Sequence, residues 1–592
     1  MELNLLPRPR SVKLSPGTFT LSPRDSPASI RVNRSGSAPR HPEGYAIAIS
    51  RDGIEILFRE PEGLRAATAT LRQLILQYGH RLPCLKIRDW PDFSRRGVML
   101  DISRGRVPKL ETLLDLAEKL ANLKINELQL YTEHTFAYRK YKSVWQSWGA
   151  LTAKEIRILD ARCRELGIDL VPNQNSFGHL RYFLEHPALK KLAEVPKPYE
   201  DAGGEFVRRP TTLAPNHPGT LPFLRKLYAE LLPNFSSKFF NVGCDETWDL
   251  GRGQSKKLCE DRGKGKVYLD FLKKIHREVS AHGKTMMFWG DIILKYPGLI
   301  RKLPGNAVAL NWGYEAGHPF QREAAKFARS RIPFYVCPGT STWQTLVGRH
   351  DNALANLRAA AVAGKKFRAK GYLICDWGDG GHPNPLAISW PMFIAGASLA
   401  WNSNNFDAAT IIPILGSNVF GDSKMARVGM DLGLVHKKLG VRIANETPLG
   451  TVIAAPRPEE RELFCRNGLK WFSKISSEKI RKTLKDIERQ RSILIRANVS
   501  STSERVLLRE LDLAARMAAQ SCKFMLWQRA VAKGRTSKAR QMALAGIGEL
   551  KRLQRDSNAS WPLRNKATPK HSSEFLKWRI DDYRRGRVTA SH

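Results

Sequence analysis

Eight short apolar runs recur along the middle of the chain, and this repetition restricts its fold more than any other feature. Helical segments such as PKLETLLDLAEKLANLK and KVYLDFLKKIHREVSAHGK separate the runs. Strands that are buried on both faces have continuous apolar sequences, and helical connections indicate that neighbouring strands run parallel. The runs cover residues 97–103, 125–133, 168–176, 238–246, 285–292, 307–314, 333–340 and 371–379.

Eight parallel strands with helices between them are typical of a closed (β/α)8 barrel. An open, doubly wound sheet is the alternative, but no G-x-G-x-x-G sequence follows the first run. The sequence therefore predicts an α/β fold built around a (β/α)8 TIM barrel over residues 93–405.

The two ends of the chain have patterns that differ from this central part. Residues 1–92 combine short β-rich pieces, YAIAIS and GIEILF, with one helical stretch, and predict a small N-terminal α/β accessory domain. Beyond residue 405 the strand-like runs stop, and charged segments with a 3.6-residue apolar period follow. Residues 406–592 are therefore expected to form a mostly helical C-terminal domain.

The chain has a formal net charge of +41, and the excess of Lys and Arg is spread over its whole length. Such a charge favours weak association with polyanions through counterion release, without selecting a base sequence. No helix-turn-helix, zinc-finger or RNP motif occurs, so we expect no specific nucleic-acid partner. Two interpretations stay open: a generally basic surface, or a polyanionic partner such as an acidic glycan.

The N-terminal sequence MELNLLPRPRSVKLSPG has charges and prolines where a signal peptide needs an apolar stretch. No apolar run reaches the ~18 residues of a membrane-spanning helix. We therefore expect a cytoplasmic protein without a membrane partner, although a start codon further upstream would change this.

The eight cysteines are scattered, and neither metal-ligand spacing nor a phosphate loop occurs, so no metal and no cofactor are expected.

Acidic and aromatic side chains gather at the predicted strand ends, where barrels of this kind place their chemistry. Carboxylates move protons or bind hydroxyl groups, and aromatic faces stack on sugar rings, so together they favour a carbohydrate substrate. One strand-end acid alone is more often a helix cap, and one Trp is more often part of the core. The recurrence at seven of the eight strands favours a functional site. Its candidate members are Asp101, Arg104, Glu133, His134, His179, Asp245, Glu246, Trp248, Trp289, Asp291, Trp312, Tyr314, Asp376, Trp377 and Asp379.

Five motifs in the predicted barrel carry a family resemblance: RRGVMLDISRGRVP, LKINELQLYTEHTF, LVPNQNSFGH, FFNVGCDETWDLG and DWGD. Together they resemble glycoside hydrolase family 20, the β-N-acetylhexosaminidases, and the similarity spans the whole barrel. The short N-terminal domain is similar to the accessory domain that often precedes that barrel. The G-x-D-E element is the most specific mark, and YTEHTFAY suggests the branch that contains hexosaminidase D.

The resemblance implies an exo-acting enzyme that removes terminal β-linked GlcNAc or GalNAc from a glycan with retention of configuration. In this family the 2-acetamido oxygen of the substrate attacks the anomeric carbon, which is an exception to the two-carboxylate scheme. Glu246 then matches the acid/base, and Asp245 matches the residue that holds the acetamido N–H. His179 and Glu133 match the His and the carboxylate behind the acid. From the residues alone, helix capping or metal binding by the two acids stays an alternative.

Six further positions are assigned to substrate binding from the same resemblance. Arg104 matches the Arg that binds ring hydroxyls, and Asp379 matches the acid of the W-x-E element. Tyr314 is assigned to the Tyr that contacts the acetamido oxygen, because CPGTSTWQ has no Tyr after strand seven. The residues that match the wall of the acetamido pocket are Trp289, Trp312 and Trp377.

The chain departs from the main branch of the family at the second and third strands. LQLYTEH stands where a histidine-rich sequence is usual, so Glu133 replaces an Asp and Tyr131 replaces a His. PNQNSFGH lacks two acids of the usual third-strand motif. These changes leave the reaction class intact and leave the choice between GlcNAc and GalNAc open.

Two other functions remain alternatives. A retaining barrel glycosidase with an enzyme nucleophile needs two carboxylates about 5–5.5 Å apart, usually on different strands. A barrel that binds glycans or polyanions without turnover would use the basic surface instead. The adjacent pair Asp245–Glu246 on one strand argues against the first alternative. The same pair together with Arg104, His179 and Asp379 argues against the second. The candidates for a second carboxylate are Asp101, Asp291 and Asp376.

Overall fold

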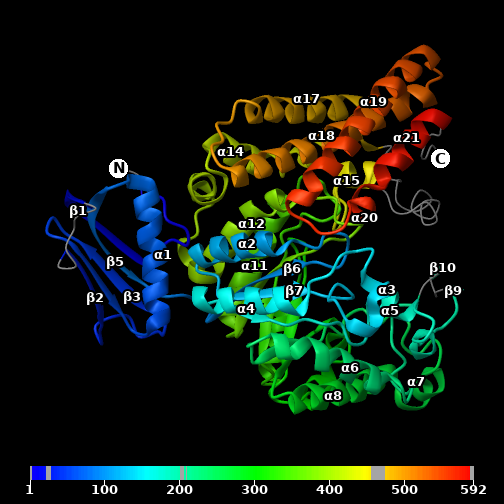
Figure 1. Ribbon diagram of the computed structural model, residues 1–592, viewed down its shortest axis with the longest axis horizontal. Helices are drawn as coiled ribbons and strands as arrows, with labels where there is room; N and C mark the ends of the chain where they lie inside the picture. Colours follow the sequence, from blue (N-terminus) through cyan, green and yellow to red (C-terminus); the bar gives the residue numbers. More distant parts are fainter. Residues whose placement is uncertain (1–2, 22–28, 201–205, 208–209, 455–473, 587–592) are drawn as a thin grey trace.

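The computed structural model describes residues 3–21, 29–200, 206–207, 210–454 and 474–586. An N-terminal sheet with one helix, a central barrel and a group of long C-terminal helices lie side by side in it (Figure 1). Within these ranges, no helix combines the length and the apolar character that crossing a lipid bilayer requires.

The eight predicted strands form one closed sheet in which all neighbours are parallel. The order along the chain is also the order around the barrel, and the last strand pairs with the first. A parallel bridge between Asn173 and Asn241 closes the remaining gap. The prediction of a (β/α)8 barrel is confirmed. The strands are β6 (Arg95–Asp101), β7 (Glu127–Tyr131), β8 (Asp169–Val171), β11 (Phe239–Asn241), β12 (Thr285–Trp289), β13 (Val308–Trp312), β14 (Phe334–Cys337) and β15 (Gly371–Asp376).

Helices cover the outside of the barrel, as the segments between the apolar runs predict. Each buries its apolar stripe against the strands; α2, for example, buries Leu113, Leu116 and Leu120. The main helices of this layer are α2 (Leu110–Asn122), α4 (Ala153–Leu166), α6 (Thr220–Leu231), α8 (Lys264–Ala281), α10 (Phe320–Arg329), α11 (His350–Lys366) and α12 (Trp390–Asn402).

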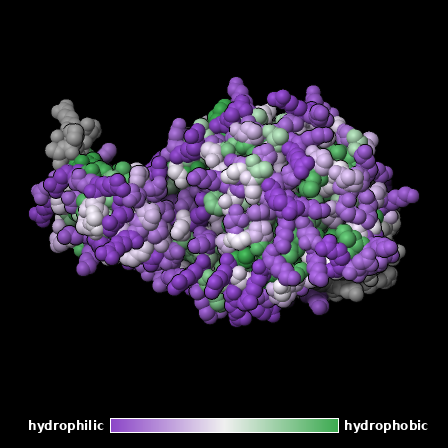
Figure 2. Space-filling model, turned by 90° about the horizontal axis from the view of Figure 1, so that it is seen from below, coloured by the Kyte–Doolittle hydropathy of each residue, from purple (hydrophilic) through white to green (hydrophobic). Residues whose placement is uncertain are grey.

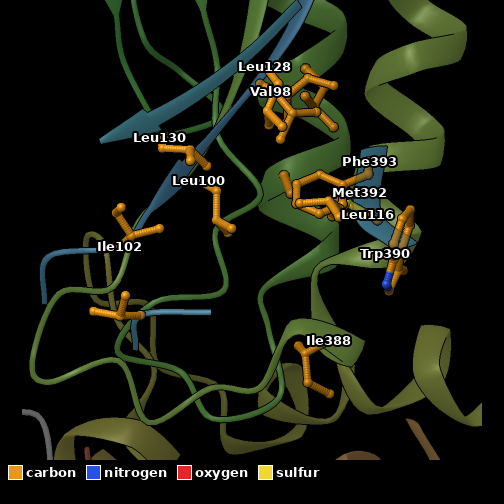
Figure 3. Packing of buried hydrophobic residues seen from close by; sticks show 14 of the residues in the cluster. Val98, Leu100, Ile102, Leu116, Leu128, Leu130, Ile388, Trp390, Met392 and Phe393 are labelled. Atoms are coloured by element: carbon orange, nitrogen blue, oxygen red, sulfur yellow. The ribbon is translucent and has the colours of Figure 1, made fainter. Parts of the chain in front are cut away.

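Side chains alternate between the outside and the inside of the barrel along each strand. Val98 and Leu100 of β6 and Leu128 and Leu130 of β7 belong to the outer core, together with residues of α2 and α12 (Figure 3). The inward-facing residues form a separate cluster, whose aromatic members near the strand ends make the floor of the barrel mouth. This cluster contains Met99, Tyr131, Val171, Met287, Trp289, Val308, Leu310, Tyr335, Cys337, Trp343, Leu373, Cys375 and Trp377.

Helix α12 joins the barrel to the N-terminal sheet. Its sequence WPMFIAGASLAWN has no charged residue, and all 13 of its residues are buried. Trp401 packs into the core of the N-terminal sheet, and its indole N–H lies 3.0 and 2.9 Å from the two carboxylate oxygens of Asp89. The N-terminal part is therefore fixed to the barrel by a buried contact.

The N-terminal part is a five-stranded sheet in the order β1-β5-β3-β4-β2. Helix α1 (Pro61–Tyr78) packs against its three central strands. The predicted strands YAIAIS and GIEILF are β3 and β4. The five strands are β1 (Ser11–Thr20), β2 (Ile30–Arg34), β3 (Tyr45–Ile49), β4 (Ile54–Phe58) and β5 (Arg81–Asp89).

The C-terminal part is helical, and no strand occurs among its described residues. The longest helix, α18 (Thr502–Ala532), begins with a capping box formed by Ser501 and Glu504. Its main partners are α17 (Ser477–Leu494) and α19 (Thr536–Ser560), and α21 (Phe575–Arg585) packs on α19. The face of the molecule in Figure 2 is mainly hydrophilic, with small and separate hydrophobic areas, as the charged helices lead us to expect.

Candidate active site

The two adjacent acids lie in a sharply turned segment that follows β11. Gly243, Cys244 and Glu246 all have positive φ angles, of 67°, 70° and 45°. A Cβ atom on Gly243 would lie 2.1 Å from Oδ1 of Asn175, so glycine is required there. The turn brings both acids to the barrel mouth in different surroundings: Asp245 is buried, whereas the Glu246 side chain is 33% exposed.

His179, at the end of the segment that follows β8, lies between the acids. Its Nε2 atom is 3.3 Å from Oδ2 of Asp245 and 3.3 Å from Oε2 of Glu246. Its Nδ1 atom is 3.9 Å from Oε1 of Glu133. Burial lowers the pKa of His179, but Asp245 and Glu246 outweigh burial and raise this pKa well above its ordinary value. The protonated form of the ring is therefore favoured next to these two acids.

Arg104 forms a second charged group on the opposite strands of the mouth. Its guanidinium lies 3.0 Å from Asp101, 3.2 Å from Asp379 and 3.5 Å from Glu133. It also lies over the ring of Trp377, 4.9 Å from the centroid. Burial lowers the pKa of Arg104, but Tyr131 and the three carboxylates outweigh burial and raise this pKa well above its ordinary value. Glu133 thus contacts both cations of the site.

Aromatic side chains surround the space next to these charges. Trp312 stacks on Tyr314 with ring centroids 5.2 Å apart, and Tyr314 lies 6.4 Å from Trp377. Trp289 lies 5.8 Å from Trp377. The indole N–H groups of Trp289 and Trp312, and Oδ1 of Asp245, have no hydrogen-bond partner among the described residues. These groups are available to a ligand, as buried polar groups usually need partners.

Three further acids at the strand ends have hydrogen-bond or ion-pair partners that the sequence did not predict. Asp101 pairs with Arg104 and accepts a hydrogen bond from Gly378 N–H. Asp291, after β12, accepts a hydrogen bond from Glu246 N–H at 3.2 Å. Asp376 points away from the mouth and accepts hydrogen bonds from three hydroxyl groups. These donors are Thr340, Thr342 and Ser389, at 2.6, 2.9 and 2.8 Å. The sequence signal for all three acids was their position at a strand end.

His134 is a strand-end candidate that the structure does not bring into the site. Its ring packs against Tyr182 and Trp148, with centroids 4.1 and 5.0 Å away. Burial lowers its pKa to about 3. Both residues follow the end of β7 at Tyr131; there the Glu133 carboxylate contacts Arg104 and His179, whereas the adjacent His134 ring packs against other aromatic side chains.

The ligand atoms of His179, Asp245 and Glu246 all lie within 4.8 Å of one another, and they are the one group among the described residues close enough to hold a metal ion. A metal would need the unprotonated Nε2 of His179. The raised pKa of His179 keeps this nitrogen protonated. A metal ion would therefore have to displace a proton from His179 in order to bind here.

Two family models match this chain. The model for the catalytic domain of glycosyl hydrolase family 20 matches residues 93–343, and the model for domain 2 of this family matches residues 22–90. Together these segments span more than half of the chain. The catalytic match ends before β15, so Trp377 and Asp379 lie outside it.

Similar proteins carry related names. A β-hexosaminidase of Vibrio furnissii is 28% identical over 285 residues, which cover 42% of this chain and 45% of that protein. Hexosaminidase D of Bos taurus is 24% identical over 208 residues, which cover 34% of this chain and 57% of the relative. The matches thus span less than two thirds of these relatives. The crystal structure of Flavobacterium johnsoniae chitobiase shares the fold, with a TM-score of 0.59 and 17% identity over 98% of this chain and 99% of that one.

Proposed function

The chain belongs to glycosyl hydrolase family 20, and from this premise we propose that it is an exo-acting β-N-acetylhexosaminidase. It releases terminal β-linked GlcNAc or GalNAc from a glycan and retains the anomeric configuration. The observation that carries the proposal is the pairing of a buried Asp245 with a partly exposed Glu246 beside the same His179 imidazolium. The names of the curated relatives support the same activity.

The reaction has two steps. In the first, the acetamido oxygen of the substrate attacks C1, and the C1–O bond breaks with its electron pair on the leaving oxygen. Glu246 gives this oxygen its carboxyl proton, so the aglycone leaves as an alcohol. In the second, water attacks C1, the oxazolinium ring opens, and the carboxylate of Glu246 takes the proton of the water. The acid is thereby restored.

Asp245 stabilises the ring intermediate. Its free Oδ1 accepts a hydrogen bond from the acetamido N–H, and its negative charge balances the charge of the oxazolinium ion. A buried carboxylate suits this role, because a fixed charge acts more strongly away from water. The exposed side of Glu246, in contrast, lets it meet both the leaving oxygen and the incoming water.

The remaining predicted residues orient the charges and the sugar. His179 holds both acids, and Glu133 lies between His179 and Arg104. Arg104 and Asp379 together offer donors and an acceptor to the ring hydroxyls. The acetamido group is enclosed by the aromatic residues of the floor, with two free N–H groups as donors. These residues are Trp289, Trp312, Tyr314 and Trp377.

The surroundings of the other carboxylates disfavour an enzyme nucleophile. Asp376 is turned outward and engaged by three hydroxyl groups, and Asp101 is paired with Arg104. Burial and the nearby Asp245 raise the pKa of Asp291 to about 7, so much of this group is neutral near pH 7. None of the three is a free carboxylate that faces the acid across a glycosidic bond.

Hydrolysis of 4-methylumbelliferyl β-GlcNAc, β-GalNAc and β-glucoside tests the proposal. We expect cleavage of the two acetamido sugars only, with the ratio of their rates giving the sugar preference. Asp245→Asn and Glu246→Gln should each lower kcat/KM by about 100-fold or more. Asp261→Asn, on the exposed part of α7 (Lys256–Arg262), is the matched control and should keep full activity. Equal cleavage of the glucoside would rule out the acetamido group as nucleophile.

A further inference from the structure

Trp248 is unusual among the residues that follow β11. In the segment from Asn241 to Leu250, only Glu246 and Trp248 reach solvent, and the Trp248 side chain is 54% exposed. The tryptophans of the barrel floor are buried or half-buried. Isolated exposed apolar residues are common on proteins. A role for Trp248 must therefore be argued from its position relative to the reacting groups.

The backbone around Trp248 is held firmly. Trp248 N–H donates to the carbonyl oxygen of Glu246 at 2.7 Å. The carboxylate of the next residue, Asp249, accepts hydrogen bonds from the backbone N–H groups of Thr211 and Thr212, both at 2.9 Å. The exposed indole is therefore presented by an anchored turn, and its direction is set by the turn.

The indole packs next to the histidine that contacts the acid. Its ring meets the ring of His179 edge to face, with centroids 5.6 Å apart and an interplanar angle of 71°. Nε2 of His179 is in turn 3.3 Å from the carboxylate of Glu246. A general acid must come within hydrogen-bond distance of the leaving oxygen. The leaving group must therefore reach Glu246 from its exposed side, and Trp248 is the other exposed side chain of this segment.

We propose that Trp248 is a binding platform for the leaving group, so that the ring of the second sugar of the substrate stacks on the exposed indole. This inference rests on the proposed function and extends it to the aglycone. A planar aromatic face offers apolar area to the C–H face of a sugar without fixing the linkage through hydrogen bonds. The substrate class is accordingly an oligosaccharide with a ring-shaped group at this position.

The test compares two substrates that share the terminal N-acetylhexosamine. One is a β-linked disaccharide, and the other is the β-fluoride, which has no ring in the leaving group. Trp248→Ala and Trp248→Leu should each lower the ratio of kcat/KM for the disaccharide to kcat/KM for the fluoride by about tenfold. Trp248→Phe keeps a planar ring and should keep most of the ratio. Leu544→Ala, at an exposed apolar residue of α19, is the control.

An unchanged ratio in both the Ala and the Leu variants would overturn the platform. Equal losses on both substrates would overturn it as well, because they would assign Trp248 to the support of His179. Comparison of the Phe and Leu variants keeps the test decisive when the Ala variant does not fold. Failure of the wild-type protein to hydrolyse either substrate would instead reject the proposed function itself.

Discussion

Asp291 has the most unusual titration among the carboxylates next to the acid pair. Burial and then the charge of Asp245 raise its pKa to about 7 from an ordinary value of 3.8, while the hydrogen bond from Glu246 N–H opposes the rise. A protonated Asp291 avoids a third negative charge beside two carboxylates. The proton on Asp291 therefore reduces the repulsion among the three acids and allows Asp245 and Glu246 to lie together.

We predict a pH-dependent effect of Asp291→Asn on stability. Because the pKa of Asp291 is raised in the folded state, folding of the wild type takes up a proton. The protonated Asp291 therefore favours the folded state at low pH, and this stability is lost as pH rises to about 7. Asn does not ionise. The free energy of unfolding of the variant, relative to wild type, should rise by about 2–3 kcal/mol between pH 5 and pH 7. Urea unfolding at several pH values measures this, and a constant difference would contradict it.

At the scale of elements, the loop after β11 is held by a buried carboxylate from another connection. Glu194 accepts hydrogen bonds from the N–H groups of Gly251, Gly253 and Ser255 at 3.0–3.2 Å and from the Ser255 hydroxyl at 2.7 Å. Glu194 comes from the long connection between β8 and α6. The position of Glu246 thus depends on a segment about fifty residues away in the chain, because the barrel places the two connections next to each other.

Gly253→Ala tests this dependence. A Cβ atom on Gly253 would lie 1.9 Å from the carbonyl oxygen of Glu194, so the loop must move. We expect a loss of about 1–3 kcal/mol in stability and a lower kcat for aryl hexosaminides. Gly298→Ala is the matched control, because nothing lies within 4 Å of its Cβ position. Equal melting temperatures and kcat values in the two variants would show that the contact with Glu194 does not set the loop.

At the scale of the whole molecule, the C-terminal part supports the connection that carries Arg104. Asn565 forms an antiparallel bridge with Pro108. Lys566 N–H donates to Val107 O, and Lys109 N–H donates to Arg564 O, both at 2.8 Å. Residues that are more than 450 positions apart in the chain thus run side by side next to the mouth. The helical part is an integral neighbour of the site.

Glu510 is the counter-charge of this contact. Its carboxylate lies 3.2 Å from Nε of Arg564, and both side chains are buried. Burial lowers the pKa of nearby Arg106 to about 10, and Glu510 opposes this shift. Glu510→Gln leaves the buried Arg564 and the half-buried Arg106 without their anion, so we expect a loss of about 3 kcal/mol in unfolding free energy. Glu488→Gln, whose pair with Lys523 is half-exposed, should change it by less than about 0.5 kcal/mol. Similar values for the two variants would contradict this account.

The eight strands and the helical C-terminal part could be predicted because burial imposes a local pattern. A strand buried on both faces must be apolar throughout, and a packed helix must repeat its apolar residues about every 3.6 positions. The charged and aromatic residues at strand ends were also predictable, since the topology brings those ends together. The domain boundaries and the roles of the site residues stay predictions.

Tertiary structure alone decided which strand-end residues work together. The sequence placed His134 and Glu133 side by side, but only Glu133 contacts the charged residues of the site. The sequence did not predict that Asp291 accepts a hydrogen bond from Glu246 or that Glu194 binds the loop after β11. Nor did it connect Asn565 with the Arg104 segment. Such contacts join residues distant in the chain, so they depend on how the closed barrel places its connections. A local sequence pattern indicates whether a residue requires burial or a polar partner. The fold determines which distant residue makes that contact.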